Sequence, residues 1–251
     1  MICQLESEQR EQHHRRHSGR PRPRRADGPN RHRHRCRKRT PTSILEMHQA
    51  LLGDFEPSIA GRWRTEPVWI GGGDLGPHEA LFVPPHDRRV ATLVDDLVRF
   101  ADRSDIPVLV QTAIAHAHFE TIHPFPDGNG RTGRALVHAQ LRHAGLTRTV
   151  TVPVSAGLLT DTNAYFEALT AYRAGDAAPI VGQFVRAAFA AIDNGGRLVE
   201  ELREIRTEWQ GRIVARSDAV AWRVLALVLR QPVLNAATIA AHLEIAPQNK
   251  A

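Results

Sequence analysis

Apolar residues recur every three or four positions along most of the chain, which is the spacing of an amphipathic α-helix. This pattern predicts helices over residues 90–103, 107–122, 129–144, 162–174 and 179–215. Asn194-Gly195-Gly196 is a candidate break in the last of them. A shorter helix is predicted from Ser43 to about Leu52, with Ser43 and Glu46 as a capping box and Gly53 after its end.

Residues 66–85 follow a different pattern, in which two short β-like runs flank a glycine-rich turn. Val68-Trp69-Ile70 forms the first run, and Ala80-Leu81-Phe82-Val83 forms the second. Gly71-Gly72-Gly73-Asp74 and Gly76-Pro77 lie between them, which predicts a β-hairpin with a long turn. The fold class predicted from the whole pattern is mostly α, with one hairpin.

Charge divides the chain at about residue 42. Residues 1–42 hold 13 Lys and Arg against 4 Asp and Glu, whereas residues 43–251 carry a net charge of −3. The first segment has almost no large apolar side chains, so we expect a disordered Arg- and His-rich tail. It is either a polybasic arm or an unselected solvated tail, and its Arg bias fits a misplaced start or a frameshift in GC-rich coding. The basic pI therefore does not make the body a nucleic-acid binder.

Several classes of protein are excluded by composition. Both cysteines, Cys3 and Cys36, lie in the tail, so the body has neither a disulfide framework nor a cysteine nucleophile. No run of apolar residues approaches the 18 that a transmembrane helix needs, and no secretory signal precedes the body. We therefore expect a cytoplasmic protein without a membrane partner.

The chemistry is concentrated between the helices predicted at 107–122 and 129–144. Asp127-Gly128-Asn129-Gly130 leads directly into the second helix, whose N-terminal N–H groups and partial positive charge suit a phosphate. Arg131 and Arg134 lie on one face of its first turns, where two cations oppose the helix dipole unless an anion binds between them. Asp127 could bind Mg²⁺, and His123 could remove a proton from a hydroxyl.

Other interpretations of the same residues are weaker. Gly128-x-Gly130-x-x-Gly133 matches the dinucleotide fingerprint, but no predicted strand precedes it, and the segment lacks the Lys-Ser/Thr ending of a P-loop. His116 and His118 lie two residues apart on a helix and point away from each other, which argues against a transition-metal cluster. Taken singly, Asp127 could be a helix cap and both arginines could be solvated.

The segment from His123 to Arg134, HPFPDGNGRTGR, resembles the Fic family signature H-x-F-x-D/E-G-N-G-R-x-x-R at every defined position. The likeness extends over roughly residues 44–215. It implies a Fic fold, a helical bundle with a β-hairpin flap, over a catalytic domain at 43–215. Most characterised members transfer AMP from ATP to a Ser, Thr or Tyr hydroxyl of a protein and release pyrophosphate.

The resemblance also implies roles for individual residues. His123 is the general base, Phe125 packs into the core, and Asp127 binds the Mg²⁺ that accompanies ATP. The expected nucleotide-binding residues are Gly128, Asn129 and Gly130 as the anion cradle, Arg131 and Arg134 on the phosphates, and Tyr165 and Phe166 beside the adenine. The target protein would dock at the flap, residues 69–83, as an added strand.

The two ends depart from the family pattern. Many members carry an inhibitory glutamate that pairs with the second arginine of the signature, here Arg134, but no glutamate completes that motif. The restraint is therefore missing, supplied by a partner, or lost with the correct reading frame. Residues 216–251 resemble the opening of a winged helix, with its first helix at 236–243 and a recognition helix starting at 246–249. The missing remainder argues against DNA binding.

Alternatives to AMP transfer stay open from the sequence. One is transfer of another nucleotide, or removal of AMP, at the same site. Others are a DNA-binding regulator with a vestigial Fic body and an inactive truncated product. The sequence does not fix whether the chain forms a homodimer.

Overall fold

The computed structural model describes residues 40–72, 76–147, 153–231 and 233–244. It divides into two compact units, and each is considered by itself. The first holds the described residues of 1–151 together with 161–185, and the second holds those of 152–160 and 186–251. The tail predicted at 1–42 falls outside the described residues except for its last three positions.

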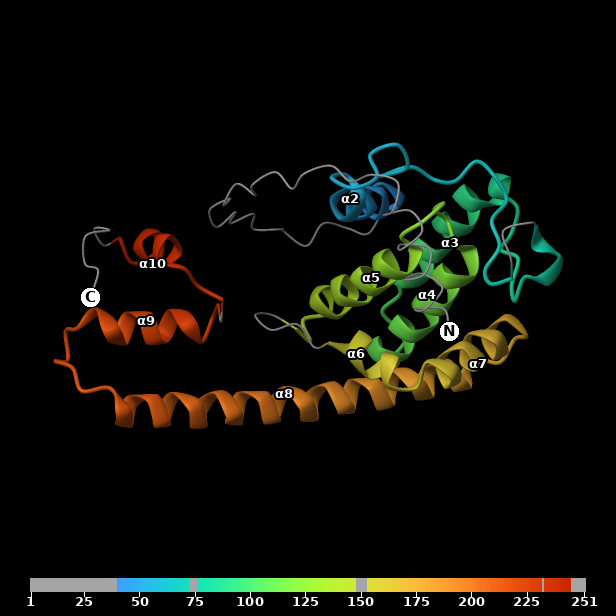
Figure 1. Ribbon diagram of the computed structural model, residues 1–251. Helices are drawn as coiled ribbons and strands as arrows, with labels where there is room; N and C mark the ends of the chain where they lie inside the picture. The colour runs from blue at the N-terminus through green and yellow to red at the C-terminus, as the bar shows by residue number, and fades with distance from the viewer. Residues whose placement is uncertain (1–39, 73–75, 148–152, 232, 245–251) are drawn as a thin grey trace. The chain divides into compact units, whose positions relative to one another are not determined.

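The first unit is a bundle of helices around α4 (Figure 1). Its helices are α2 Pro41–Leu52, α3 Val90–Ala101, α4 Val108–Ile122, α5 Asn129–His143, α7 Thr162–Arg173 and the first turns of α8 Ala178–Arg212, with the 3₁₀ turns η1 Pro77–Glu79 and η2 Asp87–Arg89. α4 packs against α3, α5 and α7, and α2 packs against α3 and α5. Nine of the fifteen residues of α4 are buried, which is expected of a helix at the centre of a bundle.

The core of this unit reaches to the loop that joins α4 to α5. Phe119 and Ile122 of α4 pack with Val94 and Leu97 of α3, and Phe125 of the loop is fully buried in the same cluster. The loop is therefore attached to the core by an aromatic ring instead of lying free on the surface.

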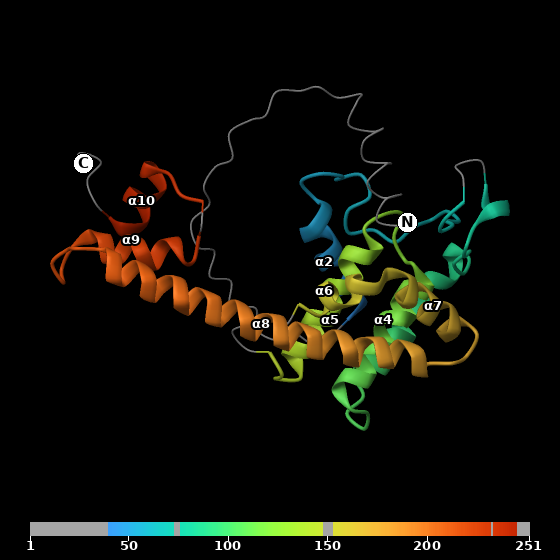
Figure 2. The same cartoon turned by 60° about the horizontal axis from the view of Figure 1, so that its bottom comes forward.

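The second unit is described by α6 Val154–Leu158, the rest of α8, α9 Val220–Val228 and α10 Ala236–Leu243 (Figure 2). The 3₁₀ turn η3 Leu159–Asp161 follows α6. α9 packs against α10, whose bounds are those predicted for the first helix of a winged helix. The segment 246–249, predicted to start a recognition helix, lies outside the described residues.

The predicted helices are confirmed with small shifts at their ends, and two details are wrong. The N-cap of α2 is Thr40, not Ser43: Thr40 Oγ1 accepts from Ser43 N, and Ser43 Oγ accepts from Thr40 N. The second is the break at Asn194-Gly195-Gly196, since α8 runs through it without interruption. Good helix formers on both sides offset the cost of two glycines, about 1 kcal/mol each.

The predicted β-hairpin is not confirmed. We call residues 66–72 and 76–85 the flap segment. Among them, pairing is limited to one antiparallel bridge between Ile70 and Phe82, and the described chain contains no strand. Gly71, Gly72 and Gly76 have positive φ, and η1 ends immediately before the predicted second arm, so the backbone changes direction next to both arms and the pairing does not extend.

No helix in the described ranges is both long and apolar enough to cross a bilayer.

The start of α5 lies very close to α2. Gly128, the N-cap of α5, has φ +76°, and a Cβ added there would lie 2.5 Å from Leu52 Cδ1 and 3.2 Å from His48 Nε2. Gly145, just after α5, has the same φ but no neighbour within 4 Å. A side chain at Gly145 would therefore meet backbone strain alone, whereas one at Gly128 would meet both strain and steric crowding.

Gly128→Ala should therefore lower the free energy of unfolding more than Gly145→Ala. We expect a loss of about 1 kcal/mol at Gly145, from the left-handed backbone alone. At Gly128 we expect about 3 kcal/mol, because overpacking adds to the same strain. Urea unfolding of the two variants and the unchanged protein measures both values. Equal losses would mean that α2 does not confine Gly128.

Candidate functional site

His123 occupies a strained position at the C-terminal end of α4. It is the C-cap residue, with φ 48° and ψ 63°, and its N–H donates to Phe119 O at 2.9 Å. Only glycine adopts this left-handed conformation without cost, so surrounding contacts must hold His123 in it. The conformation ends α4 and turns the chain into the loop at 124–128.

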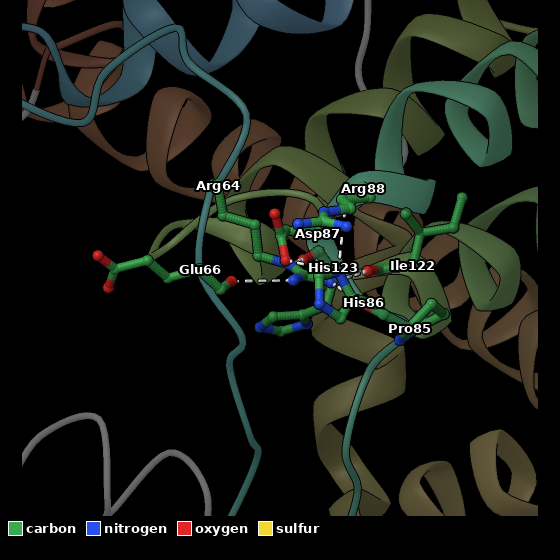
Figure 3. A network of polar contacts seen from close by, with 8 residues as sticks. All are labelled: Arg64, Glu66, Pro85, His86, Asp87, Arg88, Ile122 and His123. Carbon is green, nitrogen blue, oxygen red and sulfur yellow. Dashed lines mark hydrogen bonds and ion pairs between the residues drawn. The ribbon is translucent and has the colours of Figure 1, made fainter.

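Arg64 supplies those contacts, and the sequence pattern does not predict it. Its side chain is 3% exposed and donates to main-chain carbonyl groups (Figure 3). Nε donates to His123 O at 2.8 Å, Nη1 to Glu66 O at 3.0 Å, and Nη2 to Ile122 O at 3.4 Å and to Pro85 O. A guanidinium placed on the carbonyl end of a helix satisfies orphan acceptors and favours the helix dipole.

The charge of Arg64 has limited compensation around it. Burial lowers the pKa of Arg64 from its ordinary value, and the negative charge of Asp87 opposes that change. The carboxylate of Asp87 also pairs with His86 Nδ1 at 2.7 Å. Arg64 remains a cation at any physiological pH, because an arginine pKa starts so high.

The imidazole of His123 is held in its neutral form. Its pKa is lowered to about 4, mainly by burial and also by the charges of Arg64 and Arg173, while the Glu120 backbone carbonyl and the Asp127 charge act in the opposite direction. A histidine that is neutral at pH 7 can accept a proton, which a protonated histidine cannot. The position therefore fits a general base.

The loop after His123 is fixed by a reciprocal pair of hydrogen bonds. Phe125 N donates to Asn129 Oδ1 at 2.9 Å, and Asn129 Nδ2 donates to Phe125 O at 2.8 Å. Both residues are buried. The Asn129 side chain thus faces the loop, so an anion at this end of α5 would meet backbone N–H groups and not this amide.

His48 of α2 holds the loop from the other side, and it too was not predicted. Its ring stacks on Phe125 with centroids 3.7 Å apart. Gly61 N donates to His48 Nδ1 at 2.9 Å, so the proton resides on Nε2, which donates to Asp127 O at 3.0 Å. Burial lowers the His48 pKa, which favours this neutral form.

The N-terminus of α5 is open. It has no side-chain cap, and Gly130 carries no side chain over its first turn, while the Gly128 N–H donates to Asp127 Oδ1 at 2.5 Å. Arg131 Nη2 pairs with Asp127 Oδ2 at 2.9 Å. Arg134, one turn further, has no hydrogen bond or ion pair within the described residues. Uncapped N–H groups beside two arginines form an arrangement suited to phosphate oxygens.

Asp127 fits the role of a magnesium ligand by its chemistry. Its carboxylate is 51% exposed and lies beside the open end of α5. Magnesium in nucleotide sites is commonly bound by one or two carboxylates, the substrate phosphates and water, not by a protein cage. Within the described ranges, no group of three or more His, Cys, Asp or Glu residues could hold a metal ion.

The two aromatic residues of α7 take different positions. Tyr165 Oη is 2.8 Å from His116 Nε2, and burial raises the Tyr165 pKa well above 10. The positive charge of Arg134 acts on both His116 and Tyr165, which places this pair near the arginine. Phe166 is half-buried, with its ring centroid 5.2 Å from that of Tyr165. The hydroxyl of Tyr165 is therefore committed to α4.

Comparison with known proteins is consistent with this geometry. The Fic/DOC family model matches residues 39–141. The chain is 33% identical over 153 residues to protein adenylyltransferase fic-1 of Caenorhabditis elegans, and 32% identical over 141 residues to protein adenylyltransferase Fic of Drosophila yakuba. These alignments cover 59% and 55% of this chain but only 27% and 26% of the relatives, so the chain spans about a quarter of their length.

A solved structure shares the fold. The crystal structure of a Fic family protein from Desulfovibrio desulfuricans matches 82% of this chain and 57% of its own, with a TM-score of 0.55 and 24% sequence identity. Family model, relatives and fold together support a Fic/DOC family domain in this chain.

Proposed function

We propose that this protein transfers AMP from ATP to a Ser, Thr or Tyr hydroxyl of a target protein and releases pyrophosphate. The observation that carries the proposal is the position of His123, a neutral and partly buried histidine. One rigid loop, residues 124–128, separates it from the uncapped N-terminus of α5. The relatives named protein adenylyltransferases support the same reaction, although this chain spans only part of their length.

In the proposed reaction, His123 takes the proton from the attacking hydroxyl as its oxygen bonds to the α-phosphorus of ATP. The bond between that phosphorus and the bridging oxygen breaks, and pyrophosphate leaves. The backbone N–H groups of Gly128, Asn129 and Gly130, with Arg131 and Arg134, would hold the phosphate oxygens, and the Gly128 N–H must first leave Asp127 Oδ1. Such fixed donors contribute most where negative charge develops.

Asp127 would hold the Mg²⁺ that accompanies ATP. The ion would neutralise part of the phosphate charge. For Arg131 to reach a phosphate, its ion pair with Asp127 must open, and a cation at Asp127 would replace the arginine as partner of the carboxylate. Tyr165 and Phe166 are proposed to lie beside the adenine. Phe166 would contact it with its half-buried ring, and Tyr165 with the part of its ring that the hydrogen bond to His116 does not occupy.

The flap segment is the proposed docking place of the target. Leu81 and Val83 are exposed apolar side chains, 68% and 53%, and the single bridge leaves the remaining backbone groups of the segment without a ladder. A target segment could add to such an edge through main-chain hydrogen bonds, which read little of its sequence.

Two finer features stand as proposals beside the reaction. The packing of α9 on α10 supports a partial winged-helix unit. We do not propose that this unit binds DNA. An inhibitory glutamate supplied to Arg134 by another protein stays a proposal that rests on the family resemblance.

His123→Ala should abolish transfer of AMP. The reaction mixes purified protein, Mg²⁺ and ATP labelled at the α-phosphate, and label on protein is measured after electrophoresis. The unchanged protein should acquire label, and His123→Ala should acquire less than about one hundredth as much, because general-base loss costs 10²–10⁴-fold. His143→Ala, an exposed histidine near the end of α5, is the matched control.

Label from the γ-phosphate should stay with pyrophosphate, which separates AMP transfer from phosphate transfer. Equal α-label on the unchanged protein and on His123→Ala would reject the mechanism.

Gly130→Ala tests the anion cradle without disturbing the fold. A Cβ at Gly130 meets only the flexible end of Arg134, at 3.3 Å, so the melting temperature should not fall. The methyl group would cover N–H donors at the start of α5, and we expect kcat/KM for ATP to fall at least about tenfold, the loss of one good phosphate contact. Gly130→Ala with full activity would show that phosphates do not bind at this helix end.

A further inference from the structure

Arg173, the last residue of α7, contacts the flap segment. Its Cζ lies 3.6 Å from the centroid of the Phe82 ring, the geometry of a close cation–π contact. A planar guanidinium stacks on a ring in this way better than an ammonium group does. Since α7 packs against α4, the contact joins the flap segment to the centre of the bundle.

Phe82 is the residue through which such a contact has most effect on the flap segment. Ile70 N donates to Phe82 O at 2.9 Å, and Phe82 N donates to Ile70 O at 3.2 Å. A single bridge does not hold two arms together by itself in water. A contact from outside the flap segment to Phe82 therefore restrains both halves of the segment, because the bridge joins Phe82 to Ile70.

Arg173 also lies within electrostatic range of His123. Its charge contributes to lowering the His123 pKa, while burial lowers the pKa of Arg173 itself and the negative charge of Glu120 opposes that change. Its Nε is buried and has no hydrogen-bond partner among the described residues. The guanidinium thus has the Phe82 ring as its defined contact, and its charge acts on the imidazole of His123.

We propose that Arg173 is a positioning residue, which clamps the flap segment through Phe82 at a fixed place beside His123. The consequence rests on the proposed function: a target segment docked on the clamped flap presents its hydroxyl to the imidazole. Arg173 would then determine how well the acceptor is placed, and not how tightly ATP is bound.

The clamp itself is tested by hydrogen exchange of the nucleotide-free protein. Arg173→Met keeps an unbranched, flexible side chain without the charged guanidinium, and Phe82→Leu keeps an apolar contact without the ring. Both should speed amide exchange in peptides from 66–72 and 76–85, at Ile70 and Phe82 by about tenfold. Arg173→Lys should lie between. Unchanged exchange in Arg173→Met would overturn the clamp.

The chain offers a matched control. Arg103 Cζ lies 5.9 Å from the centroid of Phe100, in another Arg–Phe contact after α3. Arg103→Met should leave exchange in the flap segment as it is in the unchanged protein. A similar increase in both methionine variants would indicate general loosening and overturn the assignment to Arg173.

The positioning role is tested by transfer in trans, with His123→Ala protein as the acceptor. Arg173→Met should raise KM for the acceptor about tenfold, while the Kd for ATP with Mg²⁺, measured by calorimetry, changes less than about twofold. Faster exchange without a change in acceptor KM would overturn positioning. If the unchanged protein transfers no AMP, the proposed function fails, and the exchange experiment still decides the clamp.

Discussion

The interaction on which the site depends is the seating of Arg64 on the carbonyl end of α4. A helix that ends beside another helix start brings a negative end next to a positive one. The carbonyl groups of Ile122 and His123 would otherwise compete for the N–H groups of α5 or for incoming cations. With Arg64 on those carbonyls, the N-terminus of α5 keeps donors for an outside anion beyond the Gly128 N–H, which donates to Asp127 Oδ1.

The loop between the helices is rigid for a related reason. The buried Phe125 ring, the reciprocal bonds of Asn129 and the neutral His48 fix successive residues from three directions. These neighbours hold the strained backbone of His123 in a single conformation, so a substrate has little of the loop left to order when it binds. Preorganised groups of this kind lower the reorganisation cost of a reaction.

The helices and the motif were predictable because both depend on local order in the chain. Apolar spacing determines which face of α3 or α4 is buried, and the signature from His123 to Arg134 is contiguous. Arg64, His48 and Arg173 were not predictable, since each acts through a contact with a residue at least 59 positions away in the chain, and no spacing rule marks such a residue. The hairpin failed differently: its apolar runs are genuine, but positive-φ glycines and a 3₁₀ turn limit the pairing to Ile70 and Phe82.

The choice of acceptors around Arg64 affects how the sequence could vary. All four of its partners are main-chain oxygens, on Glu66, Pro85, Ile122 and His123. A different side chain at Glu66 would present the same oxygen, so substitution there leaves the hydrogen bond intact. Only position 64 must therefore keep a particular side chain, because its guanidinium binds three separate stretches of backbone.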